Sequence, residues 1–181
     1  MAIQINNQMR HRLLALATLI LFTIPFTGIT SGQQVNYSDP GTWLLGYFDQ
    51  DALLLEPHDK WYNNEFDKYE FDPDALMELA EMPKENLKIV IVLGTWCPDS
   101  RREVPRFLKV LQSCGFPMEN VDLIGVDSYK IAPIENYDKL DIERVPTFII
   151  YKNKVEAGRI IEYPKSSLER DMVEILASIK N

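Results

Sequence analysis

Two cysteines are the residues of this 181-residue sequence whose side chains could do covalent chemistry. Cys97 lies in the run Trp-Cys-Pro-Asp-Ser, and Cys114 follows 17 positions later, just before Gly115. A thiolate can attack a disulfide or be oxidised to a sulfenic acid. Two isolated cysteines are too few for a disulfide framework, and without nearby histidines they do not indicate a structural zinc site. We therefore expect no metal and no cofactor, and we expect His58 in a solvated loop.

The elements on either side of Cys97 predict how it is held. An apolar run from Leu87 to Leu93 predicts a buried strand that leads into it. After it, apolar side chains recur at helical spacing. Those side chains are Val104, Phe107, Leu108 and Leu111. Cys97 thus begins a helix, where free N–H groups and the helix dipole favour the thiolate. Ser100 can donate a hydrogen bond to that thiolate. The negative charge of Asp99 disfavours the thiolate, and the positive charge of Arg101 can compensate for it.

The rest of the sequence predicts helices that alternate with strands. In chain order the further elements are a helix from Pro73 that ends before Pro83, a strand at 121–126, a weaker helical stretch at 134–142, strands at 148–151 and 155–161, and a last helix opened by a capping box of Ser166 and Glu169. This order predicts a mixed sheet covered on both faces.

Over residues 72–181 the sequence resembles the thioredoxin superfamily. The features that carry the resemblance are a buried strand running into Trp96-Cys97-Pro98, Pro105 within the next helix, Val145-Pro146-Thr147 before a hairpin, and a terminal amphipathic helix. The resemblance implies an α/β fold with a central mixed β-sheet flanked by α-helices on both faces. It also implies an exposed Cys97 faced by a cis Pro146, with Val145 pairing with an extended substrate. The substrate-binding residues it implies are Trp96, Pro98, Arg101, Val145, Pro146 and Thr147.

Two positions depart from the pattern of that family. Ser100 stands where a second cysteine is usual, and a serine cannot resolve a mixed disulfide. Ile91 and its neighbours are apolar where many members bury an acid. Cys114 does not replace the missing thiol, because 17 helical residues span roughly 25 Å and a disulfide needs alpha carbons within about 7 Å. We expect Cys114 to be a small packed residue.

Two functions fit this pattern. In one, the protein is a monothiol exchange or isomerase-like enzyme acting on protein or small-molecule thiols and disulfides, with Cys97 and Ser100 as catalytic residues and a part in cell redox homeostasis. In the other, it is a non-catalytic peptide- or protein-binding module that kept the fold. The rate of Cys97 alkylation against pH discriminates between them.

The first 71 residues predict export and an added segment. Arg10 and Arg12 precede an apolar run at 13–26 and small residues at 30–32, the order of a signal peptide over 1–32. The alternative is a membrane anchor at 13–29, although that run is short for a bilayer span. Residues 33–71 form an aromatic-rich N-terminal extension expected to pack on the 72–181 domain.

The net charge of the exported form excludes some classes of binding partner. Without the signal peptide the chain has 17 basic and 27 acidic residues, a net charge of −10. Such a surface repels nucleic acid and anionic membranes. We therefore expect a periplasmic or secreted protein that binds no nucleic acid and has no stable membrane insertion after cleavage.

Overall fold

The computed structural model describes residues 35–179. The predicted signal peptide at 1–32 and the alternative anchor at 13–29 lie outside these residues. Within residues 35–179, none of the helices has the length and apolar character that crossing a bilayer requires.

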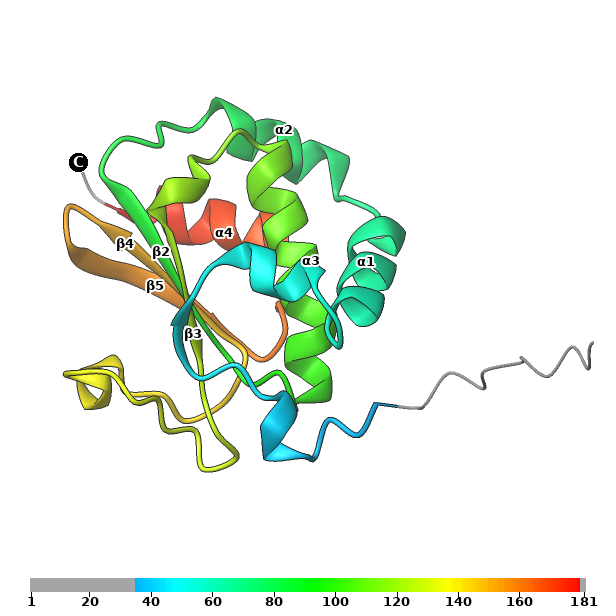
Figure 1. The fold of residues 1–181 in the computed structure, drawn as a ribbon. Helices are drawn as coiled ribbons and strands as arrows, with labels where there is room; N and C mark the ends of the chain where they lie inside the picture. The colour runs from blue at the N-terminus through cyan, green and yellow to red at the C-terminus, as the bar shows by residue number, and fades with distance from the viewer. Residues whose placement is uncertain (1–34, 180–181) are drawn as a thin grey trace, which may run out of the picture. The chain divides into compact units, whose positions relative to one another are not determined.

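A five-stranded mixed sheet forms the centre of the domain, which confirms the predicted α/β class (Figure 1). Its strands lie in the order β1-β3-β2-β4-β5. Their bounds are β1 Gly46–Phe48, β2 Leu87–Leu93, β3 Val121–Gly125, β4 Thr147–Lys152 and β5 Val155–Ile161. Strand β2 is parallel to β3, and the other three pairings are antiparallel. Because β2 is central and covered on both faces, its sequence is an almost continuous apolar run, and the predicted bounds match the observed ones.

Within residues 35–179, four α-helices accompany the sheet. They are α1 Asp59–Lys68, α2 Pro73–Glu81, α3 Pro98–Ser113 and α4 Leu168–Ala177. Helix α2 begins as predicted, because the Asp72 carboxylate accepts a hydrogen bond from the Ala75 N–H at 3.0 Å. The capping box predicted for α4 is wrong. Ser167 caps this helix, and Glu169 is fully buried where its carboxylate accepts a hydrogen bond from the Tyr69 hydroxyl at 2.9 Å.

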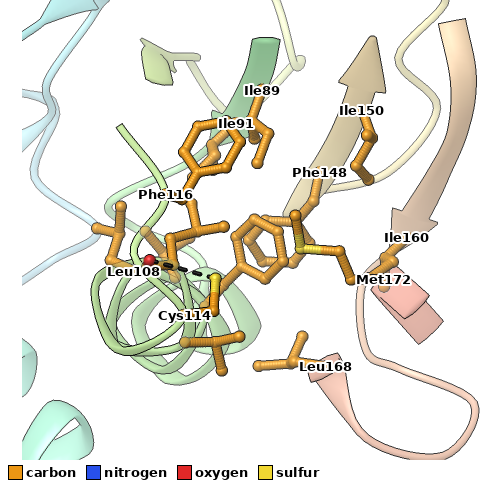
Figure 2. Close-up of a cluster of buried hydrophobic side chains, with 14 of the residues drawn as sticks. Ile89, Ile91, Leu108, Cys114, Phe116, Phe148, Ile150, Ile160, Leu168 and Met172 are labelled. Atoms are coloured by element: carbon orange, nitrogen blue, oxygen red, sulfur yellow. Dashed lines mark hydrogen bonds between the residues drawn. The ribbon is translucent and has the colours of Figure 1, made fainter. Parts of the chain in front are cut away.

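All four helices contribute side chains to one core, on one face of the sheet (Figures 1 and 2). Ile89 and Ile91 of β2 point to this face because alternate residues of a strand share a side. Phe107 of α3 and Phe148 of β4 meet there with ring centroids 4.4 Å apart. This core fixes the tilt of α3 against the strand that leads into it, and so the position of the residue at its start.

The opposite face of the sheet is covered by an irregular segment where a helix was predicted. Residues 127–142, which we call the covering segment, contain a single 3₁₀ turn, Tyr137–Leu140, in place of the helical stretch predicted at 134–142. Asn136 and Asp141 bracket this turn with left-handed backbone, at φ 57° and 50°, so the turn cannot extend into an α-helix. Ala132, Leu140 and their apolar neighbours in the segment pack against the sheet.

Residues 35–71 supply an edge strand and a helix. Strand β1 pairs with β3, and α1 lies against α3. The expectation of a solvated His58 is wrong: it is 3% exposed at the start of α1, with its ring edge-on to Trp61 at 5.8 Å. Burial lowers the pKa of His58, against the opposing effect of Asp59. The boundary at residue 72 between an extension and a domain stays a prediction.

Candidate functional site

Cys97 is the N-cap residue of α3. Its backbone is extended, Pro98 occupies the first helical position, and its carbonyl accepts the hydrogen bond of the Arg101 N–H at 3.1 Å. The thiol donates a hydrogen bond to the Val145 carbonyl, with Sγ 3.4 Å from the oxygen. Cys97 is 7% exposed, so the expectation of an exposed cysteine is wrong. It belongs to the apolar cluster on the sheet face that the covering segment occupies.

The turn at residues 145–147 meets the start of α3 although 48 positions separate the two bonded residues. The peptide bond between Val145 and Pro146 is cis. Thr147 is buried, and its hydroxyl donates a hydrogen bond to the Arg144 carbonyl at 2.7 Å, which closes the turn. The structure therefore brings Cys97 together with Val145 and Pro146, from the two parts of the chain that the sequence singled out.

The Ser100 side chain makes a different hydrogen bond from the predicted one to the Cys97 thiolate. Its side chain is 0% exposed, and its hydroxyl oxygen accepts a hydrogen bond from the Gly94 N–H at 3.2 Å. Within residues 35–179 no hydrogen bond joins Ser100 to the Cys97 sulfur. Ser100 thus ties the first turn of α3 to the end of β2, which fixes the loop that carries the cysteine.

Trp96 is held by contacts that sequence reasoning missed. Its indole N–H donates to the Val126 carbonyl at 3.0 Å, and its ring lies against Gly94, where an added Cβ would come within 2.6 Å of the indole. Trp43 lies nearby, with the two ring centroids 6.2 Å apart and the rings tilted by 51°. The nearby Thr95 hydroxyl accepts a hydrogen bond from the N–H of Leu44 at 3.2 Å. The aromatic residues ahead of the domain were the signal that this part of the chain has a packed partner.

Charged groups at the start of α3 pair differently from expectation. Asp99 forms an ion pair with Arg102 at 2.8 Å, so part of its negative charge is offset. The hydrogen bond to Glu103 is the largest cause that raises the pKa of Arg102 above its ordinary value; the charges of Glu103 and Asp99 add to it, and burial opposes it. The Arg101 guanidinium lies over the ring of Tyr37, 4.2 Å from its centroid. Burial raises the pKa of Tyr37 and the nearby Arg101 lowers it.

Cys114 occupies the other end of α3. It is the C-cap residue, 4% exposed, and its thiol donates to the Leu111 carbonyl at 3.3 Å (Figure 2). Burial raises the pKa of this thiol. The prediction of a small packed residue is confirmed. Both cysteines are free thiols, and residues 35–179 hold no group of three or more side chains able to bind a metal ion.

Comparison with known proteins identifies the family to which this chain belongs. The thioredoxin family model matches residues 55–176. A curated relative, the chloroplastic thioredoxin Y of Oryza sativa subsp. japonica, is 30% identical over 105 residues, which cover 53% of this chain and 57% of that protein. The chain therefore spans little more than half the length of this relative.

Two crystal structures share the fold. One is a protein of unknown function from Pseudomonas aeruginosa, with a TM-score of 0.54 and 15% identity over 73% of this chain and 91% of that one. The other is an HIV epitope-scaffold, with a TM-score of 0.52 and 17% identity over 73% and 92%. At these identities the likeness is one of fold alone.

Proposed function

The chain belongs to the thioredoxin family, and we propose that it exchanges thiols and disulfides through the single thiol of Cys97, outside the cytoplasm. Family membership supports a thiol-redox role in general. The observation that carries the finer proposal is the position of Cys97 as the N-cap residue of a 16-residue helix, beside the 145–147 turn. Free N–H groups of the first helical turn and the helix dipole favour a thiolate there.

The proposed reaction has two exchange steps. The Cys97 thiolate attacks one sulfur of a substrate disulfide, the substrate S–S bond breaks, and its other sulfur leaves as a thiolate. This forms a mixed disulfide with Cys97. A second thiol, on the substrate or in solution, then attacks the mixed disulfide and releases Cys97 as a thiolate. Attack by a substrate thiol gives isomerisation without net redox change, whereas attack by an external thiol reduces the substrate at that thiol's expense.

The turn beside Cys97 is the proposed place where the substrate chain binds. The Val145 N–H has no hydrogen-bond acceptor among the described residues, so an extended peptide can pair with it. Thr147 of this turn is proposed to contact the substrate, together with three residues near Cys97: Trp96, Pro98 and Arg101. Ser100 is proposed to act in catalysis by holding the loop, because its hydroxyl oxygen accepts a hydrogen bond from the Gly94 N–H.

The proposed location rests on residues 1–32. Arg10 and Arg12 ahead of the apolar run at 13–26 support cleavage and release outside the cytoplasm. The test is N-terminal sequencing of the protein recovered from a cell fractionation. A mature N-terminus near residue 33 in the extracytoplasmic fraction supports the proposal, and an intact chain in the cytoplasm contradicts it.

The experiment that tests the chemistry is alkylation of Cys97 as a function of pH. A catalytic thiolate gives a midpoint well below the value of free cysteine, about 8.5. Mixed disulfides trapped from an extracytoplasmic extract on the wild-type protein, and absent with Cys97→Ser, then identify substrates. An alkylation midpoint at or above that of free cysteine, together with the absence of trapped mixed disulfides, contradicts the exchange proposal.

A second candidate function is a binding module without redox chemistry. It is favoured by two observations: Ile91 is a fully buried apolar residue behind the site, and Ser100 cannot resolve a mixed disulfide. In this case the 145–147 turn and the segment around Trp43 hold a peptide, and Cys97 is a packed cap. Peptide capture that persists in Cys97→Ser, together with an ordinary alkylation midpoint, distinguishes this function from exchange.

A further inference from the structure

The covering segment lies over the sheet face on which the Cys97 side chain is buried. Ala132 of the segment is itself buried in the same cluster as Cys97, and Leu140 and Ile142 pack against that cluster. Parts of the segment are well exposed, with Tyr129 at 83%. A substrate disulfide must approach a cysteine that is only 7% exposed, so this cover has to move for exchange at Cys97.

One side chain provides the polar attachment of the segment to the rest of the protein. Arg159 of β5 donates from Nη1 to the carbonyls of Leu140 and Asp141, each at 3.1 Å. Within residues 35–179, no other hydrogen bond from outside the segment reaches residues 128–142. Glu156 fixes the guanidinium in place by accepting from its Nε and Nη2, at 2.6 and 2.7 Å. The remaining attachment is apolar contact.

The closed position of the segment is held against opposing local energies. Lys130, Asn136 and Asp141 adopt left-handed backbone, with φ between 50° and 63°, which is costly for residues that carry a Cβ. The Tyr137 hydroxyl is buried without a hydrogen-bond partner among the described residues, which is also unfavourable. Without the polar attachment, only apolar contact would offset these costs.

We infer that Arg159 is a positioning residue that holds the covering segment closed over Cys97 and so controls the access of substrates to the thiol. The significance for substrates rests on the proposed function of Cys97. The attachment of the segment is a property of the fold, and its effect is measured by the alkylation rate of Cys97 without any substrate. Arg159 acts through backbone carbonyls of the segment and does not touch the sulfur.

The test is the rate at which iodoacetamide alkylates each cysteine of the intact protein. Trypsin cuts after Arg101 and Lys109, so Cys97 and Cys114 fall in different peptides and mass spectrometry reports both rates in one sample. With Arg159→Ala we expect alkylation of Cys97 to accelerate by about tenfold or more, since two charge-assisted hydrogen bonds are lost. The rate at Cys114, on the opposite face of the sheet, should not change.

Three further variants sharpen this result. Glu156→Ala, which frees the guanidinium without removing it, should give a smaller acceleration, and Arg159→Lys, which restores a donor, should recover part of the protection. Arg170→Ala removes an ion pair between α4 and α2, away from the covering segment, and should leave both rates unchanged. If Arg159→Ala does not fold, Arg159→Lys and Glu156→Ala decide the question in the same assay.

The inference is overturned if Cys97 of Arg159→Ala reacts within about twofold of wild type, a difference of less than about 0.4 kcal/mol. If that variant does not fold, the same result for Glu156→Ala overturns it. It is equally overturned if Cys97 and Cys114 accelerate together, because that reports general loosening. Failure to trap mixed disulfides, with the alkylation results as expected, removes the proposed function and leaves the role of Arg159 intact.

Discussion

The two ends of α3 each carry a buried free cysteine, and they differ in what surrounds the sulfur. Cys97 caps the N-terminus, where unpaired N–H groups and the positive end of the dipole lie. Cys114 caps the C-terminus, where the dipole disfavours a thiolate and burial raises the pKa of the thiol. Both thiols donate to a carbonyl, Cys97 to a turn 48 positions away and Cys114 to its own helix. The two cysteines therefore do not differ in burial; they differ in helix polarity and in the origin of the neighbouring carbonyl, and the proposed function makes Cys97 the reactive one of the two.

The largest expected effect is on disulfide exchange. Cys97→Ser should reduce the reaction with a chromogenic aromatic disulfide to background, because the proposed nucleophile is removed. Cys114→Ser should react within about twofold of wild type, since its thiol is buried and away from the 145–147 turn. Release of the aromatic thiolate measures both. Equal losses in the two variants would remove the distinction between the ends of α3.

A second cysteine at the N-terminal end should change the chemistry there. Ser100→Cys places a thiol one helical turn from Cys97, and we expect it to resolve mixed disulfides and to increase reduction of insulin by dithiothreitol by about tenfold or more. The double variant with Cys97→Ser is the control and should show no gain. If Ser100→Cys also shows none, the absence of a second thiol is not what limits this site.

Alanine substitution of the glycines beside the two ends of α3 should lower the free energy of unfolding for different reasons. Gly94→Ala would bring a Cβ to 2.6 Å from the Trp96 indole, and such overpacking costs about 1–3 kcal/mol of unfolding free energy. Gly115→Ala meets no atom within 4 Å but has φ at +71°, so the cost is backbone strain of about 1 kcal/mol. Urea unfolding gives both values, and tryptophan emission should shift only for Gly94→Ala. A shift in both would contradict this account.

The smallest expected effect is a pH dependence at the C-terminal end. Because the pKa of Cys114 is raised by burial, the folded protein binds its proton more tightly than the unfolded chain. This contribution to stability is complete below the ordinary thiol pKa and is lost as pH rises through the raised value. The stability difference between wild type and Cys114→Ala should thus be smaller at pH 10 than at pH 7, in urea unfolding at both. A constant difference would show that Cys114 does not titrate in this range.

Sequence periodicity predicted the elements whose signals are local. The strand at Leu87–Leu93, the cap at Asp72 and the buried stripe of α3 follow from neighbouring residues, and the structure has them as predicted. The helical stretch predicted at 134–142 was wrong because two left-handed residues, Asn136 and Asp141, interrupt a pattern that spacing alone cannot exclude. Ser167 and not Ser166 caps α4 because a tertiary contact, from Tyr69, holds Glu169.

The candidate site was predictable in its residues and not in its surroundings. Cys97, Val145 and Pro146 carry motif signals, and the fold brings them together. Cys97 is buried in a cluster to which the covering segment contributes Ala132, and the Ser100 hydroxyl oxygen accepts a hydrogen bond from the Gly94 N–H across the loop between them. Such long-range contacts leave no periodic signal in the chain, so their effects on access and hydrogen bonding require coordinates.

The contact between Trp43 and Trp96 has an optical consequence. Indole rings 6.2 Å apart couple electronically, and one of them belongs to the residue next to Cys97. Thiolates and disulfides quench indole fluorescence on contact, so formation of a mixed disulfide should alter the emission of this pair. The third tryptophan, Trp61, lies in α1 and supplies a steady background. The protein thus contains an intrinsic probe with which the proposed exchange can be followed in real time, without any label.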